Sequence, residues 1–295
     1  MLVHEPVMTR EVLAYLAPEH GGVFVDCTAG LGGHSKALLD AGAGRVIGLD
    51  RDPAALVMAA ETLAPWRDRV DLVHSDYRAF AAVLEQRGIS RVDGALADLG
   101  MSSMQLEATG RGFSFQREDP LDMRMDTTTG ATAADLLRDA EESEIADAIF
   151  QYGEERFSRR IARSIVYRRE QAPIETTSQL ASIVRRAIPQ RGFSRIDPAT
   201  RTFQAMRIWV NRELDGLDEF LEAVAERLQT GARMVIITFH SLEDRIVKHT
   251  MRALAQRENA SIRVVTKKPV LPQADEIERN PRARSAKLRV AERIA

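Results

Sequence analysis

The sequence predicts an α/β fold in which a doubly wound, mostly parallel sheet carries an inserted all-helical domain. Short apolar runs alternate with amphipathic helical stretches at both ends of the chain, whereas the stretch between them shows only helical periodicity. A chain of 295 residues is long enough for two compact units, or for one domain with a large insertion.

Four apolar runs in the first part of the chain are expected to form strands. They span residues 23–26, 45–50, 70–74 and 94–99. The helical stretches that separate them span residues 35–41, 53–63 and 80–86. Because each strand is followed by a helix, the chain crosses over and returns in the same direction, which makes these strands parallel.

The pattern changes after Gln105, and residues 106–126 are expected to form a long loop. Beyond this loop the apolar residues recur at helical spacing for some sixty residues. We therefore place a helical domain at residues 110–199, inserted between the fourth and fifth strands. Residues 1–109 and 200–295 are assigned to the sheet domain.

The chain is expected to return to the sheet after this insertion. The Asp-Pro pair at 197–198 predicts the start of a helix. Residues 233–239 and 262–265 predict two further strands. Between them, Ser241 and Asp244 have the spacing of a capping box at the start of another helix.

The composition fits a soluble globular protein, because 44% of the residues are hydrophobic and 28% are charged. No window approaches the roughly 18 uninterrupted apolar residues of a membrane span. The first residues carry neither a signal-peptide nor a transit-peptide pattern, so we expect a cytoplasmic protein. Cys27 is the sole cysteine, which excludes an intrachain disulfide and predicts a small buried side chain.

The net charge of -2 leaves local clusters as the route to nucleic-acid binding. Three stretches are rich in cationic side chains. They contain Arg156, Arg159, Arg160, Arg163, Arg168 and Arg169; Arg185, Arg186, Arg191 and Arg195; and Arg279, Arg282, Arg284, Lys287, Arg289 and Arg293. Such clusters are suited to phosphate contacts, and the alternative for each is a solvated helix face.

A glycine-rich turn joins the first strand to the first helix. Asp26 ends the strand, and Gly30, Gly32 and Gly33 follow, so a ligand can approach bare backbone at a helix N-terminus. A nicotinamide-dependent oxidoreductase would have G-x-G-x-x-G directly after its strand. The different spacing here favours the methyl donor S-adenosylmethionine over a pyrophosphate. Alternatively, Asp26 does no more than cap the turn.

Further polar residues follow the next three strands at the same edge of the sheet. Asp50 can accept hydrogen bonds from both ribose hydroxyls of a nucleoside, or else begins a helix. Tyr77 offers an aromatic face for adenine, with Asp76 as an acceptor beside it, or else fills a turn with a buried ring. Asp98 ends the fourth strand, beside the topological switch point where doubly wound enzymes place reacting groups.

Two other groups of residues invite a ligand interpretation that we do not adopt. His240 and Glu243 follow the fifth predicted strand, but no H-E-x-x-H pattern is present and the sole cysteine is distant, so no metal site is predicted. His240 is instead expected to line the mouth of the active site. Met123 and Met125 are expected to pack the insertion against the sheet domain.

Blocks of sequence along nearly the whole chain resemble one bacterial family. They are His4-Glu5-Pro6-Val7, Gly32-Gly33-His34-Ser35, Asp98-Leu99-Gly100, Arg111-Gly112-Phe113-Ser114-Phe115, Pro120-Leu121-Asp122-Met123-Arg124-Met125-Asp126, Tyr152-Gly153-Glu154-Glu155-Arg156-Phe157, Thr200-Arg201-Thr202-Phe203-Gln204-Ala205, Phe239-His240-Ser241-Leu242-Glu243-Asp244 and Asn280-Pro281-Arg282-Ala283-Arg284-Ser285-Ala286-Lys287-Leu288-Arg289. These blocks resemble the signatures of the ribosomal RNA small subunit methyltransferase H family, also called the RsmH or MraW family.

The resemblance implies a Rossmann-like class I methyltransferase that uses S-adenosylmethionine to methylate N4 of a cytidine in the decoding region of 16S ribosomal RNA. It implies the small ribosomal subunit as partner and a cytoplasmic location. It places the cofactor contacts on Gly32, Gly33, His34, Asp50, Tyr77, Asp98 and Gln105. Asp98 is also the catalytic candidate, because an acceptor that orients the amine and takes its proton helps the delocalised N4 lone pair to attack.

Several alternatives stay open at this point. A ribosome assembly factor on the same scaffold would bind the small subunit and transfer no methyl group. Methylation of DNA or of a small molecule is separated from rRNA methylation only by the resemblance. The chain lacks the Asn/Asp/Ser-Pro-Pro-aromatic motif of most amine-methylating DNA enzymes. The sequence also leaves open whether the protein forms a homodimer.

Overall fold

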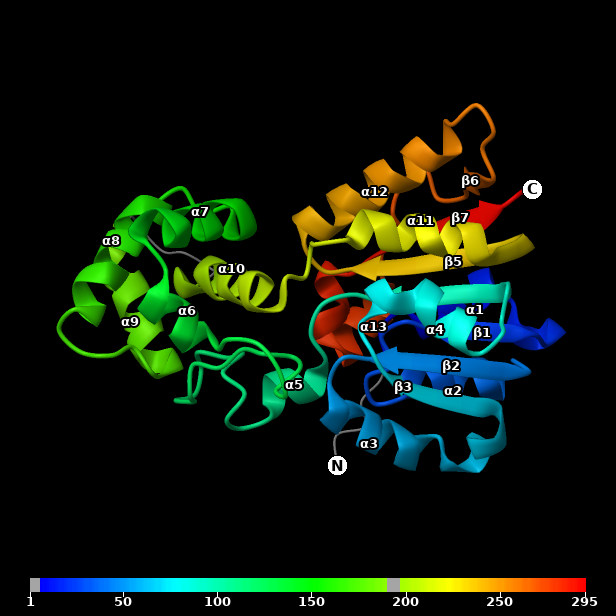
Figure 1. Ribbon diagram of the computed structural model, residues 1–295, viewed down its shortest axis with the longest axis horizontal. Helices are drawn as coiled ribbons and strands as arrows, with labels where there is room; N and C mark the ends of the chain where they lie inside the picture. The colour runs from blue at the N-terminus through cyan, green and yellow to red at the C-terminus, as the bar shows by residue number, and fades with distance from the viewer. Residues whose placement is uncertain (1–5, 190–196) are drawn as a thin grey trace. The chain divides into compact units, whose positions relative to one another are not determined.

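The computed structural model describes residues 6–189 and 197–295 and confirms a mixed α/β fold (Figure 1). Four residues of the sequence analysis lie outside the described residues. They are His4 and Glu5 of the first family block and Arg191 and Arg195 of the second cationic cluster.

The chain divides into two compact units. The sheet unit comprises Met1–Gly100 and Gly216–Ala295, and the helical unit comprises Met101–Asp215. The predicted insertion at residues 110–199 is shorter at both ends than the helical unit. At the C-terminal end the difference arises because the last helix of the unit buries Phe203 and Met206 among the other helices of the insertion. The sequence analysis had placed this helix in the sheet domain.

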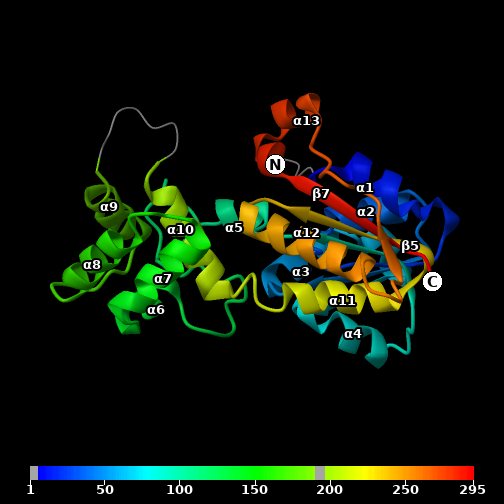
Figure 2. The ribbon, with the colours of Figure 1, turned by 90° about the horizontal axis from the view of Figure 1, so that it is seen from above.

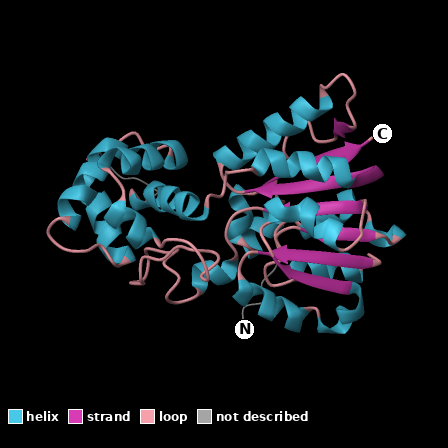
Figure 3. Cartoon of the chain, viewed as in Figure 1, coloured by secondary structure: helices cyan, strands magenta, loops and turns pink. Residues whose placement is uncertain are grey.

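A seven-stranded sheet among the described residues forms the centre of the sheet unit, in the order β3-β2-β1-β4-β5-β7-β6 (Figure 3). The strands are β1 (Val23–Asp26), β2 (Arg45–Asp50), β3 (Val70–His74), β4 (Val92–Asp98), β5 (Leu228–Thr238), β6 (Ile262–Val264) and β7 (Lys287–Arg293). The first five run parallel, and β7 runs antiparallel to β5 and to β6. The chain order reverses between β1 and β4, so the carboxyl ends of these strands flank the topological switch point.

Strand β7 corrects the interpretation of the C-terminal cationic cluster. Residues 287–290 alternate polar and apolar side chains, and all residues of the strand except its two ends are buried, with β5 and β6 as its neighbours. Leu288 and Val290 are fully buried in the core. A central strand is therefore formed by residues that the sequence analysis interpreted as part of a phosphate-binding stretch or a solvated helix face.

Helices cover both faces of the sheet. One face carries α1 (Thr9–Leu16), α2 (Gly33–Asp40) and α3 (Pro53–Thr62), and the other carries α4 (Phe80–Gln86), α11 (Leu217–Arg227) and α12 (Ser241–Ala255). Alternate residues of one strand serve the two layers, since Phe24 belongs to the first core and Val25 to the second. Figure 2 shows α1 and α2 on one side of the strands and α4 and α11 on the other.

The predicted cap of one helix differs from the structure, whereas the predicted start of another agrees with it. His240, not Ser241, is the N-cap of α12, and its capping box is completed by Glu243 at the third helical position. Asp244 faces β7 instead. Helix α10 (Ala199–Asn211) begins after Pro198, and Asp197 accepts a hydrogen bond from the backbone nitrogen of its first residue at 2.8 Å.

The helical unit contains its own core. Its helices are α5 (Ser103–Glu107), α6 (Ala133–Asp139), α7 (Glu142–Gly153), α8 (Ser158–Arg169), α9 (Thr177–Ala187) and α10. Met123 and Met125 are buried in this core, which corrects the expectation that they pack against the sheet domain. The buried amide of Asn211 holds the loop that carries them, because it accepts from the nitrogen of Met125 and donates to the carbonyl of Met123, each at 2.7 Å.

Within residues 6–189 and 197–295, no helix has the length and apolar character that a membrane crossing requires.

Candidate functional site

The glycine-rich turn after β1 is tied to the end of β2. Ala29 donates from its backbone nitrogen to the carbonyl of Leu49, and Gly30 donates to Oδ2 of Asp50, each at 2.7 Å. The approach requires glycine at position 48, because a Cβ there would lie 2.9 Å from a side-chain carbon of Leu72 and 3.1 Å from the Cβ of Ala29. The turn therefore has a fixed shape beside the Asp50 carboxylate.

Asp50 ends β2, as predicted, and its carboxylate is held by backbone groups. Oδ2 accepts from Gly30, and Oδ1 accepts from the nitrogen of Asp52 at 2.8 Å. Burial raises the pKa of Asp50 to about 6, against the lowering effect of these two hydrogen bonds. Since a carboxylate has about four lone-pair sites, the group retains capacity to accept from two hydroxyl groups of a ligand.

Asp26 is fully buried and serves the turn itself. Its carboxylate accepts from the nitrogen of Thr28 at 3.2 Å and from the hydroxyl of Ser35 at 2.7 Å. Burial raises the pKa of Asp26, while His34 and these hydrogen bonds act in the opposite direction. These contacts match the alternative in which Asp26 caps the turn.

Two glycines without side chains lie at the N-terminus of α2, where neighbouring residues pack closely. Gly32 is the N-cap residue, with a φ of 82° that disfavours other residues, and a Cβ on it would lie 3.0 Å from Leu63. A Cβ on Gly33 would lie 3.1 Å from Pro6. The backbone nitrogens at the start of α2 are thus not shielded by side chains of their own, as a ligand at a helix N-terminus requires.

His34 and Asp98 form the polar centre of the site. His34, in the first turn of α2, is 5% exposed, and its Nε2 lies 3.6 Å from Oδ2 of Asp98 at the end of β4. Burial by itself lowers the pKa of His34, but the carboxylates of Asp98 and Asp26 outweigh this effect and the pKa is raised. The raised pKa favours the protonated form of the imidazole beside the Asp98 carboxylate.

Three buried atoms of this pair have no hydrogen-bond partner within the part of the chain that the structure describes. They are both ring nitrogens of His34 and Oδ1 of Asp98. A buried polar atom without a partner costs about 1–3 kcal/mol, so such atoms are rare in folded proteins. Their concentration at the carboxyl ends of β1, β2 and β4 indicates a place where a polar ligand supplies the missing bonds.

Comparisons with known proteins agree on one family. The model of the MraW methylase family matches residues 1–294. The ribosomal RNA small subunit methyltransferase H of Geotalea uraniireducens is 48% identical over 307 residues, which cover 99% of this chain and 98% of the relative. The enzyme of the same name from Cyanothece sp. is 50% identical over 293 residues, which cover 99% of this chain and 95% of the relative.

The chain belongs to the MraW methylase family. The likeness to solved structures is weaker and adds no argument. An rRNA methylase from Streptococcus thermophilus, for example, has a TM-score of 0.44 at 11% identity, with 100% of both chains covered.

Membership of the MraW family identifies the methyl donor as S-adenosylmethionine. The residues present fit this group. The bare backbone at Gly32 and Gly33, the Asp50 carboxylate and the unpartnered atoms of His34 and Asp98 lie around one edge of the sheet. The nicotinamide alternative, which the glycine spacing disfavoured, is set aside.

The position after β3 is more complex than predicted. Tyr77 begins a short 3-10 helix, η3 (Tyr77–Ala79), and its half-buried ring packs on Phe220 with centroids 4.7 Å apart. Asp76 is engaged by the side chain of Arg78, with two bonds of 2.8 Å, and by Arg51 at 3.4 Å. A contact between adenine and Tyr77 stays a prediction, whereas the Asp76 carboxylate already has cationic partners.

Gln105 belongs to the helical unit. It is 4% exposed and completes the capping box of α5, where its side-chain oxygen accepts from the nitrogen of Ser102 at 3.0 Å. Its role in cofactor binding stays a prediction. The same holds for the other residues named from the family resemblance, since the geometry brings Gly32, Gly33, His34, Asp50 and Asp98 together without a bound ligand.

Sequence reasoning missed the residue that fixes Asp98. The hydroxyl of Thr28 accepts a hydrogen bond from the backbone nitrogen of Asp98 at 2.7 Å, which ties the turn after β1 to the end of β4. The two residues are seventy positions apart, so no local pattern reveals the bond. The clue would have been the position of Thr28 two residues after the strand end, at the switch point of the predicted sheet.

Proposed function

We propose that this MraW family member transfers a methyl group from S-adenosylmethionine to N4 of a cytidine in the decoding region of the small-subunit ribosomal RNA. The main support is the high identity, over nearly full length, with relatives named ribosomal RNA small subunit methyltransferase H. The ring nitrogens of His34 and Oδ1 of Asp98, which have no hydrogen-bond partner among the described residues, support a site for donor and acceptor amine together.

In this proposal each polar residue of the sheet edge has a distinct task. Asp50 accepts hydrogen bonds from the ribose hydroxyls of the donor, and Gly32 and Gly33 let it approach the start of α2. Tyr77 offers a face to adenine. S-adenosylmethionine supplies an electrophilic methyl group on a positively charged sulfur, so the protein must bring the nucleophile in line with it.

Asp98 is the proposed catalytic residue. Its Oδ1 has no partner among the described residues, so it is able to accept a hydrogen bond from the N4 amine. This bond orients the amine and provides an acceptor for the proton that N4 loses when the nitrogen–carbon bond forms and the carbon–sulfur bond breaks. The His34 imidazole, whose pKa is raised by the neighbouring carboxylates, lies 3.6 Å from Oδ2, so Oδ1 is the oxygen available to the amine.

The helical insertion is proposed as the RNA-recognition part of the enzyme, as the sequence suggests for residues 110–199. The amine of a cytidine is shielded in a stacked or paired helix, so the base must be turned out of the RNA to reach the donor. A unit rich in arginine on its surface is suited to hold the surrounding RNA by its phosphates.

Transfer of tritiated methyl groups tests the proposal. The purified chain is incubated with labelled S-adenosylmethionine and small ribosomal subunits that lack this modification, and the RNA is digested for nucleoside mass spectrometry. We expect labelled N4-methylcytidine at one position. Subunits that already carry the modification are the control and should accept no label.

Two other results would replace the proposal. A different methylated nucleoside would move the reaction to another atom or base. Donor binding and subunit binding without any transfer would favour the assembly factor.

A further inference from the structure

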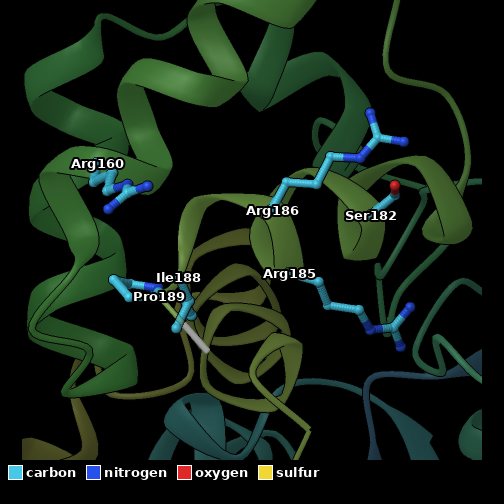
Figure 4. A pocket seen from close by; sticks show the side chains of 6 residues that line it. All are labelled: Arg160, Ser182, Arg185, Arg186, Ile188 and Pro189. Atoms are coloured by element: carbon cyan, nitrogen blue, oxygen red, sulfur yellow. The ribbon is translucent and has the colours of Figure 1, made fainter. Parts of the chain in front are cut away.

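The helical unit contains a pocket that the proposed catalysis does not use. It has a volume of about 530 Å³ and lies between α8 and the end of α9. Figure 4 shows its lining side chains, which are Arg160, Ser182, Arg185, Arg186, Ile188 and Pro189. Three of these six residues are arginines, and none of the six is acidic.

The arginines of this pocket differ in how they are neutralised. Arg185 forms an ion pair with Asp197, with an Nη2 to Oδ2 distance of 2.8 Å. Arg160 and Arg186 are exposed and have no carboxylate partner among the described residues. Two arginines without a counter-charge in the described part of the chain therefore line the same pocket.

Two other arginines of the same helix have partners within the protein. Arg169 donates to the carbonyls of Leu137 and Ala140 at 2.6 Å each, so it stabilises the end of α6. Arg163 lies 3.8 Å from the carboxylate of Glu142. Arg160 differs from these two arginines, because it has no such partner among the described residues.

A large aromatic side chain lies on the same face of α8. Tyr167 is 67% exposed, and it follows Arg160 by seven residues, which is close to two helical turns. The two side chains therefore project from one side of the helix, about 10 Å apart along its axis. Cationic groups next to an exposed aromatic ring are typical of surfaces that bind single-stranded nucleic acid.

We propose that the pocket formed by Arg160, Ser182 and Arg186 binds a backbone phosphate of single-stranded RNA, and that Tyr167 stacks on a base of the same strand. The inference rests on the proposed function for its ligand and assigns the residues that hold it. Guanidinium groups suit this task because they donate paired hydrogen bonds to phosphate oxygens, and the Ser182 hydroxyl adds a further donor. The ring of Tyr167 contributes stacking that is independent of salt.

The test compares the double variant Arg160→Gln/Arg186→Gln with Arg159→Gln. Arg159 is an exposed arginine next to Arg160 on the same helix, but it does not line the pocket. Binding of a fluorescein-labelled single-stranded 12-nucleotide RNA is measured by anisotropy at several salt concentrations. We expect the double variant to bind at least about tenfold more weakly, with the slope of log K against log salt reduced by about 0.7 for each phosphate that is no longer neutralised.

Tyr167→Ala gives a different signature. Loss of base stacking should weaken RNA binding about tenfold while the salt slope stays that of the unmodified chain. Tyr167→Phe keeps the stacking face and should bind as the unmodified chain does.

Methyl transfer to small ribosomal subunits separates this inference from the proposed function. The double variant should raise KM for subunits and keep kcat and the Kd of S-adenosylhomocysteine. If its RNA affinity and salt slope equal those of Arg159→Gln, the pocket assignment is wrong, even when the unmodified chain methylates the subunit. If the unmodified chain methylates no RNA but the double variant still loses RNA binding, the proposed function fails and the pocket assignment stands.

Discussion

Two partly buried carboxylates of the sheet unit lie near the ends of neighbouring strands, yet their surroundings are opposite. Asp244 has two cationic partners, with Arg289 at 2.6 Å and Lys287 at 3.3 Å. Asp98 has one oxygen without a partner among the described residues, and the imidazole of His34 lies 3.6 Å from its other oxygen. Asp98 is the last residue of β4, and Asp244 lies in the first turn of α12, which follows β5.

The difference separates structural polar groups from those that await a ligand. A buried acid whose oxygens are all satisfied stabilises the fold around it, and removing it leaves its partner buried and charged. A buried acid with a free oxygen is a cost to the isolated protein, which a ligand can recover. We therefore expect substitution of Asp244 to lower the free energy of unfolding, and substitution of the site carboxylates to change turnover or donor binding.

The largest effect is expected for Asp244→Ala. It leaves the side chain of Arg289, which is 7% exposed, without its carboxylate, so the free energy of unfolding should fall by about 3–5 kcal/mol. Urea denaturation measures this loss, and the Kd of S-adenosylhomocysteine should change little in the folded variant. Asp275→Ala removes an acid of 58% side-chain exposure and should cost less than about 0.5 kcal/mol. If both variants lose the same free energy of unfolding, the ion pairs of Asp244 contribute no more to stability than those of an exposed acid.

Asp98→Asn should leave the fold intact and reduce turnover. The amide keeps the shape of the side chain but cannot take up a proton, so kcat for methyl transfer should fall about 100-fold. The Kd of S-adenosylhomocysteine and the midpoint of thermal unfolding serve as controls and should stay close to those of the unmodified chain. Full turnover in this variant would end the assignment of Asp98 as the catalytic residue.

Asp50→Asn should act on donor binding instead of chemistry. Loss of charge-assisted hydrogen bonds to the ribose should raise the Kd of S-adenosylhomocysteine about tenfold, while kcat at saturating donor stays within a few-fold. Asp76→Asn is the matched comparison, because the carboxylate of Asp76 is already bound by Arg78 and Arg51. Calorimetry should detect little change for Asp76→Asn. If Asp76→Asn raises the Kd more than Asp50→Asn does, Asp76 and not Asp50 is the acid that binds the donor.

The smallest effect is a pH dependence of donor binding. The pKa of Asp50 is about 6 in the free site, and ribose hydroxyls donate to the ionised form, so the pKa in the complex must be lower. Binding at pH 5 therefore requires loss of a proton, and the Kd should rise about tenfold between pH 7 and pH 5. Above pH 7 the Kd should be constant. In Asp50→Asn the Kd should no longer rise through titration of this carboxyl. If the Kd of the variant changes with pH as in the unmodified chain, another residue causes the titration.

The central strands were predictable because their signal is local. The runs that form β1, β2 and β3 are short and mostly apolar, and the structure confirms them residue for residue. Strand β7 was missed because its cationic residues drew attention away from the period-two alternation that marks a strand. The structure accounts for these charges by ion pairs. Lys287 and Arg289 pair with Asp244, and Glu292 of the same strand pairs with Arg233 at 2.9 Å.

The candidate site was predictable in position but not in detail. Strand ends and glycines place Asp50 and Asp98 at one edge of the sheet, since parallel strands end together. The cap by His240, the bond from Asp98 to Thr28 and the pairing of Asp76 with Arg78 depend on which side chains meet in three dimensions. Spacing along the chain does not contain that information.

The place of β7 between β5 and β6 has a consequence for synthesis on the ribosome. Strands emerge in chain order, so β6 leaves the exit tunnel before the strand that will pair with it. Until residues 287–293 have emerged, β5 presents an open edge and β6 has no neighbour in the sheet. Until β7 is in place, the chain therefore presents unpaired strand edges with which another polypeptide could pair.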